Sequence, residues 1–119
     1  MREFACAVSR GFSASGIASS AKRFPGQGDA YAILTLHCPA LSSLLTTELR
    51  REELVPFRLT IAEDVHTTIT CQIALPKTTH SDIPCSLSRD ITTNLPRSGL
   101  WSKGVIVTDR LKMNAVAET

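Results

Sequence analysis

Two histidines and two cysteines form the clearest metal-binding pattern in the sequence. They are His66, Cys71, His80 and Cys85, spaced H-x4-C-x8-H-x4-C, and tetrahedral zinc accepts two thiolates together with two imidazoles. However, if residues 67–75 form a strand, His66 and Cys71 point to opposite faces of it. The pattern also lacks the short C-x₂₋₄-C spacing of zinc ribbons. The sequence therefore predicts no metal ligands and no cofactor.

Three other segments contain residue types that are used in covalent or acid–base catalysis. Cys38 follows His37 before an expected helix, whose N-terminus favours a thiolate. Ser13 lies in the string Gly-Phe-Ser-Ala-Ser-Gly, which lacks the G-x-S-x-G spacing and the preceding strand of a nucleophile elbow. Glu63 and Asp64 are adjacent carboxylates, which an expected turn would place in solvent rather than across a cleft. Because each pattern also fits an ordinary structural role, we predict no catalytic or cofactor-binding residue and expect a protein that is not an enzyme.

The charge distribution argues against nucleic-acid binding. The formal net charge is +2, and the excess lies in residues 1–28, whereas the rest of the chain is nearly balanced. Such a body lacks the dense positive field that binding to a phosphate backbone requires. Trp101 could stack on a base, but we interpret it as a partly buried residue. We therefore expect an unknown protein partner and no nucleic acid.

Length, composition and the apolar runs predict a single-domain protein that is located inside the cell. The 119 residues suffice for one core, and 43% hydrophobic with 20% charged residues is typical of a globular protein. No apolar run approaches the roughly 20 residues of a membrane-spanning helix. The apolar run Phe4 to Val8 is shorter than the roughly 7–15 residues expected in a secretory signal. We therefore expect reduced cysteines and an intracellular location, cytoplasmic or mitochondrial.

Residues 1–28 form a basic leader, rich in serine and alanine. Over residues 2–13 the apolar residues Phe4, Ala5, Val8 and Phe12 share one face of a helix. The leader resembles mitochondrial presequences in its composition and in the string Arg-Gly-Phe-Ser. This resemblance implies targeting to the organelle and nothing about the mature fold. The alternatives are a disordered N-terminal tail and a helix that binds a membrane surface or a ligand.

The remainder, residues 29–119, is predicted to contain both strands and a helix. Apolar residues at helical spacing predict a helix over 39–54 that ends at Pro56. Alternating apolar residues then predict a β-hairpin, with strands at 57–61 and 69–75. Further strands are predicted at 30–37 and 104–108, a long irregular loop near 77–99, and a polar tail from residue 109.

The expected fold is a small α+β single domain. One helix packs on a mainly antiparallel sheet of three to four strands, and the flexible basic leader precedes it. Our leading hypothesis for function is a non-enzymatic interaction or accessory protein that is targeted to an organelle. One alternative is a metal- or redox-linked protein that uses scattered His and Cys side chains. A second is a lineage-restricted protein without a well-packed domain. A third is a small hydrolase or transferase, for which the sequence offers only Cys38 and His37.

Overall fold

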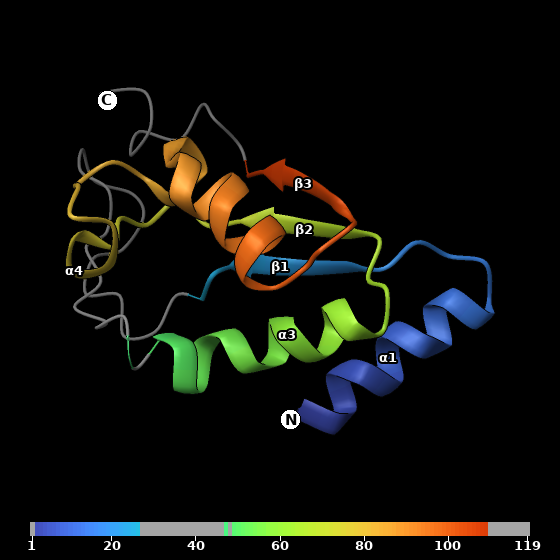
Figure 1. Ribbon diagram of the computed structural model, residues 1–119. Helices are drawn as coiled ribbons and strands as arrows, with labels where there is room; N and C mark the ends of the chain where they lie inside the picture. Colours follow the sequence, from blue (N-terminus) through green and yellow to red (C-terminus); the bar gives the residue numbers. More distant parts are fainter. Residues whose placement is uncertain (1, 27–46, 48, 110–119) are drawn as a thin grey trace.

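The computed structural model describes residues 2–26, 47 and 49–109 (Figure 1). Its elements, in chain order, are helix α1 (Arg2–Ala14), strand β1 (Ser20–Phe24), the π-helical turn η1 (Leu49–Glu53), helix α3 (Leu54–Ala62), strand β2 (Thr67–Thr70), the short helix α4 (Pro76–Thr79), the 3₁₀ turn η2 (Cys85–Leu87), the π-type helix η3 (Asp90–Gly99) and strand β3 (Val105–Thr108). Helical segments therefore separate successive strands. None of the helices described is both long and apolar enough to span a bilayer.

The three strands form a parallel sheet in the order β1-β2-β3. Thr67 pairs with Ser20 of β1 on one side and with Val105 of β3 on the other. The expected antiparallel sheet is therefore wrong. Parallel neighbours need long crossover connections, and here those connections contain α3 in one case and α4, η2 and η3 in the other. All three strands consequently end at the same edge of the sheet.

A single cluster of buried side chains joins the sheet to the helices. It draws residues from β1, from η1 and α3, from the segment after β2, and from η2 and η3: Phe24, Leu49, Leu54, Phe57, Cys71, Ile73, Leu75, Cys85, Ile91 and Leu100. Within this cluster the rings of Phe24 and Phe57 meet edge to face, with centroids 5.1 Å apart. This contact ties β1 to α3.

The predicted β-hairpin is wrong, because its first strand is part of helix α3. The alternation of Phe57, Leu59 and Ile61 suggested period 2, yet Leu54, Phe57 and Ile61 also recur at helical spacing. In the structure Leu54 and Phe57 are buried, while Leu59 is 37% exposed. Pro56 lies in the first turn of α3, where a missing N–H costs little, so it does not end the helix.

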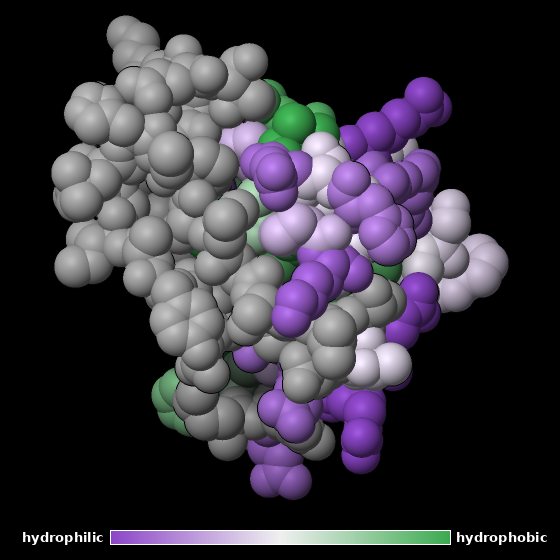
Figure 2. All heavy atoms as spheres, turned by 90° about the vertical axis from the view of Figure 1, so that its left-hand side faces the viewer, coloured by the Kyte–Doolittle hydropathy of each residue, from purple (hydrophilic) through white to green (hydrophobic). Residues whose placement is uncertain are grey.

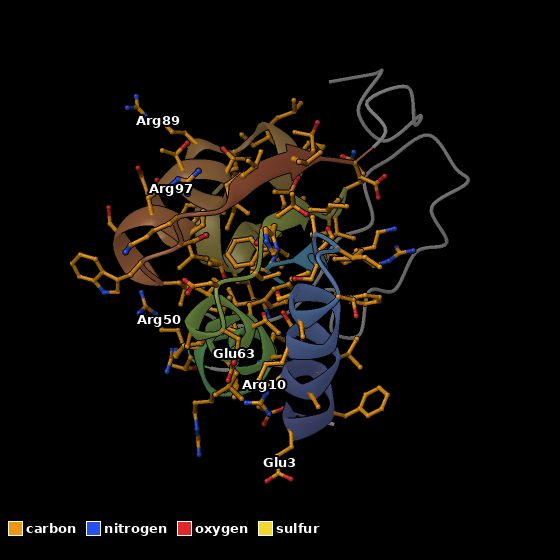
Figure 3. All side chains as sticks on the ribbon, turned by 90° about the vertical axis from the view of Figure 1, so that its right-hand side faces the viewer. Glu3, Arg10, Arg50, Glu63, Arg89 and Arg97 are labelled. Carbon is orange, nitrogen blue, oxygen red and sulfur yellow. The ribbon has the colours of Figure 1, made fainter. Side chains whose placement is uncertain are left out.

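Residues 2–14 of the basic leader form a packed helix instead of a flexible segment. The helix expected over 2–13 is confirmed as α1, which lies against α3 (Figures 1 and 3). Ser9 and Ser19 share a buried hydrogen bond of 3.1 Å, and Arg10 forms an ion pair of 2.9 Å with Glu63. The apolar stripe that suggested a targeting helix faces outward, as the 71% exposure of Phe4 shows.

The remaining expectations have mixed outcomes. The strand expected over 104–108 is confirmed as β3. The range 77–99, expected to be irregular, contains most of α4 and all of η2 and η3. The strand expected over 30–37 and most of the helix expected over 39–54 lie outside the described residues, as does the expected domain boundary after residue 28.

Gly104 permits the close approach of β3 to the start of β2. A Cβ at this position would lie 2.7 Å from the carbonyl oxygens of both Val65 and His66, and the next amide, Val105 N–H, donates to His66 at 2.9 Å. We expect Gly104→Ala to lower the free energy of unfolding by about 1–3 kcal/mol, because backbone must shift to accept the methyl group. Urea unfolding followed by circular dichroism measures this. Gly11→Ala is the control, since a Cβ there meets nothing within 4 Å and alanine favours the helix; equal losses in both variants would contradict the prediction.

Candidate functional site

The candidate site lies at the edge where the three parallel strands end. Pro25, Cys71 and Asp109 directly follow β1, β2 and β3, and the register places the last residues of the strands side by side. Enzymes with parallel α/β sheets place their catalytic groups at this edge, because the loops that follow the strands converge there. Of the three residues, Asp109 supplies a carboxylate, and its side chain is partly buried. Figure 2 looks onto this edge and shows mainly polar side chains on the described surface.

The end of β1 brings basic and acidic side chains together. Lys22 and Arg23 line a hollow of about 350 Å³ with Glu52 and Glu53. Gly26, with φ of +131°, lies so close to Glu53 that a Cβ on it would be 2.7 Å from the Cβ of that residue. Glycine is therefore required on both conformational and steric grounds. The two segments that meet here, β1 and η1, are thus held in contact at the edge of the sheet.

The end of β2 places polar and thiol groups beneath this edge. The Cys71 N–H donates to the carbonyl of Phe24 at 2.8 Å, which ties the end of β2 to the end of β1. The buried Gln72 accepts a hydrogen bond from the Ser86 hydroxyl. The Cys71 and Cys85 thiols are hydrogen-bonded to each other, which lowers the pKa of Cys71 and raises that of Cys85; burial opposes the first shift and adds to the second.

A larger hollow, of about 760 Å³, lies at the opposite end of the sheet. Its lining includes His66, Trp101 and Gly104, around the starts of β2 and β3. Trp101 is 79% exposed and has φ of +58°, so the interpretation of a partly buried residue is wrong. We assign the functional site to the other edge, because the starts of the strands in such folds serve stability and their ends serve chemistry.

The structure separates the four residues of the His/Cys pattern into different regions. Cys71 and Cys85 are in contact in the core, whereas His66 lies before β2, at the opposite end of that strand from Cys71. There His66 Nδ1 accepts a hydrogen bond from the Ser19 N–H at 3.3 Å. His80 is exposed at the C-terminus of α4. Within the described ranges, no three His, Cys, Asp or Glu side chains are grouped to hold a metal ion.

Three of the other residues weighed from the sequence lie away from the edge where the strands end. Ser13 is exposed on α1, and Glu63 and Asp64 follow α3 near the start of β2. Glu63 pairs with Arg10 there. His37 and Cys38 lie outside the described residues.

Sequence reasoning missed Asp109, although a usable signal was present. The strand that precedes it was predicted from the run Val-Ile-Val-Thr, but Asp109 itself was assigned to a polar tail. A carboxylate directly after a strand of a parallel sheet is typical of a catalytic position in a barrel or an open α/β sheet. The antiparallel fold that the sequence suggested removed the reason to give Asp109 that role.

Comparison with known proteins gives consistent matches. The family described as glycosyl hydrolase family 3 N terminal domain matches residues 1–119. A protein of Arthroderma benhamiae described as an uncharacterized secreted glycosyl hydrolase is 34% identical over 105 residues, which cover 87% of this chain and 30% of that protein. The solved family 3 β-N-acetylglucosaminidase of Paenibacillus sp. strain FPU-7 matches with a TM-score of 0.84 and 36% identity, over 92% of this chain and 20% of its own. A fungal multi-domain β-N-acetylglucosaminidase of family 3 gives a TM-score of 0.87 and 30% identity, over 98% of this chain and 14% of its own.

These matches change the functional interpretation. The expectation of a non-enzymatic accessory protein is wrong, because the matched family and the matched structures are glycoside hydrolases. For the same reason neither the metal- or redox-linked protein nor the lineage-restricted chain without a packed domain describes this protein. The chain nevertheless spans less than a third of each of these relatives. By its sequence match over residues 1–119 and by its parallel βα architecture, the chain belongs to the N-terminal domain of glycosyl hydrolase family 3.

Proposed function

We propose that this chain forms part of the catalytic domain of a β-N-acetylglucosaminidase, an enzyme that hydrolyses the bond between a β-linked N-acetylglucosamine residue and its neighbour. The observation that carries the proposal is the placement of Asp109 directly after β3, at the edge where the parallel strands end. The two solved relatives with this name, at 36% and 30% identity, support the substrate class.

The chemistry of glycoside hydrolysis explains why a carboxylate at this edge matters. These enzymes flank the scissile bond with two groups, of which one protonates the leaving oxygen and the other attacks the sugar or activates water. We assign one of these two roles to the Asp109 carboxylate. The basic side chains of Lys22 and Arg23 at the end of β1 would help bind the sugar hydroxyls and amide by donating hydrogen bonds.

An extracellular location fits this function. The relative of Arthroderma benhamiae is described as secreted, and this supports secretion of the present protein in place of the cytoplasmic or mitochondrial location expected from the sequence. Glycoside polymers of the surroundings would then be accessible to the enzyme.

A graft tests the proposed activity, because the chain spans 20% of the Paenibacillus enzyme. This chain replaces the matched segment of that enzyme, and release of 4-nitrophenol is measured from the N-acetyl-β-glucosaminide and from the β-glucoside. We expect the graft to retain activity and to prefer the N-acetylated substrate by at least about tenfold, since a site that pairs a buried substrate amide rejects an analogue without it. The 119-residue chain is assayed alongside on its own. A folded graft without activity on either substrate would contradict the proposal, and a preference for the glucoside would contradict the substrate class.

A further inference from the structure

Two buried thiols lie in contact beneath the candidate site. Cys71 and Cys85 are each 1% exposed, and both belong to the core cluster of buried side chains, where the two thiols interact. Their chemistry is not used by the proposed hydrolysis. Both residues are present as thiols in this structure.

The backbone on each side of the pair is fixed. The Cys71 N–H donates to Phe24 O and the Cys85 N–H donates to Ile73 O, both at 2.8 Å. An antiparallel bridge between Ala74 and Pro84 holds the two segments together. Because main-chain bonds hold both residues, their side chains stay in contact without a large rearrangement of the loop between them.

We propose that Cys71 and Cys85 are a disulfide-forming pair, which cross-links the end of β2 to η2 under oxidising conditions. A disulfide requires two cysteines that are close, with side chains directed toward each other. The Ala74–Pro84 bridge and the hydrogen bond from Cys85 N–H to Ile73 O bring the two segments together, and both thiols are buried in the same core cluster. The cross-link closes the segment that contains α4. It therefore fixes the residue that directly follows β2, at the edge where the strands end.

A small disulfide such as glutathione disulfide oxidises the two thiols in two exchange steps. The Cys71 thiol loses its proton and attacks one glutathione sulfur, forming a mixed disulfide and releasing one glutathione thiol, which takes up that proton. The Cys85 thiol then loses its proton and attacks the Cys71 sulfur, and the second glutathione leaves as a thiolate that takes up this proton. Two electrons pass from the protein thiols to glutathione disulfide. Cys71 is the first nucleophile because the hydrogen bond from Cys85 and the charge of Arg23 lower its pKa.

Oxidation of the two buried thiols requires that an oxidant reaches them. The thiols are buried, so exchange takes place during folding or during local opening of the short segments α4 and η2. Secreted proteins fold in an oxidising compartment, and in this respect the inference rests on the proposed extracellular location. The cross-link itself is tested in vitro, independently of location and of glycosidase activity.

Peptide mapping of the full chain tests the inference. The protein is equilibrated in glutathione buffers of varied ratio, quenched with acid, alkylated and digested with trypsin, which places Cys71 in fragment 59–77 and Cys85 in fragment 78–89. We expect one product with the summed mass of these fragments less two hydrogen atoms. We also expect the native protein to be half oxidised at a ratio of glutathione to glutathione disulfide that is at least about tenfold higher than the ratio needed in 8 M urea. The reason is that the fold raises the effective concentration of one thiol at the other.

Two variants sharpen this result. Cys85→Ser should stop the reaction at a mixed disulfide of Cys71 with glutathione, whereas Cys6→Ser should leave the cross-link unchanged. The inference would be overturned if both cysteines stayed as thiols in the native protein while they were fully oxidised in urea. Separate glutathione adducts on the two cysteines as end products, or equal buffer ratios in both conditions, would also overturn it.

Discussion

Replacing Asp109 by asparagine is expected to lower kcat on an aryl N-acetyl-β-glucosaminide by about 10²–10⁴-fold, the range for loss of a positioned catalytic group. Asparagine keeps the shape of the side chain but cannot attack a sugar carbon or accept a proton at neutral pH. The variant is assayed in the graft described above, beside the unmodified graft. Because the proposed role places the carboxylate at the reacting atoms, we expect the loss in kcat to exceed any change in KM.

The structure explains why Asp109 should be held rigidly enough for this role. Strand β3 pairs along its length with β2, from Val105 opposite Thr67 to Thr108 opposite Thr70. The turn before β3 is fixed by Arg97, whose Nη1 donates to the carbonyls of Ser102 and Gly104 at 2.8 and 2.7 Å. The pairing with β2 and the hydrogen bonds of Arg97 therefore hold β3 in place. A carboxylate that directly follows such a strand suits a reaction that requires exact positioning of the catalytic group.

Asp64→Asn is the matched control for this prediction. Asp64 is exposed after α3, near the start of β2 and therefore at the opposite end of the strands, and its φ of +55° suits asparagine as well as aspartate. We expect this variant to keep full activity. Asp109 would not be the catalytic group if the Asp109→Asn graft kept more than about a tenth of the activity of the unmodified graft while its circular dichroism spectrum was unchanged.

Local elements of this fold could be predicted where one signal dominates. β3 was predictable because β-branched residues follow Gly104 in an unbroken run, and α1 because its apolar residues keep helical spacing over residues 2–13. Helix α3 was not, because Phe57, Leu59 and Ile61 alternate as in a strand, while Leu54, Phe57 and Ile61 recur at helical spacing. The tertiary packing, which buries Phe57 against Phe24 and leaves Leu59 exposed, agrees with the helical spacing.

The candidate site depends on pairings between residues that are far apart in the sequence. Pro25, Cys71 and Asp109 become neighbours only because β1, β2 and β3 are parallel, and no local pattern specifies that arrangement. The choice of an antiparallel sheet therefore also hid the site. Likewise, Cys71 and Cys85 suggested metal ligation as members of a spaced pattern, whereas the fold brings them together without the two histidines.

The core of this domain should be most sensitive at Phe24, the residue that joins the sheet to α3. Phe24 is 0% exposed, its ring meets Phe57 edge to face, and its carbonyl accepts the Cys71 N–H. We expect Phe24→Ala to lower the free energy of unfolding by about 3–5 kcal/mol, because it removes buried apolar surface and leaves a cavity. Since small domains are stable by only about 5–15 kcal/mol, a large part of the population would unfold in mild urea. Circular dichroism in a urea titration measures the loss.

Two further variants separate this effect from the general loss of a phenylalanine. Phe4→Ala removes the same side chain from α1, where it is 71% exposed, and should cost less than about 1 kcal/mol. Phe57→Ala, combined with Phe24→Ala, should give a coupling energy of about 0.5–1.5 kcal/mol, as expected for an aromatic pair in contact. Equal losses for Phe24→Ala and Phe4→Ala would mean that the sheet and α3 do not share a core. The parallel edge that presents Asp109 would then lack its main support, because the contact between Phe24 and Phe57 holds β1 against the helix that leads into β2.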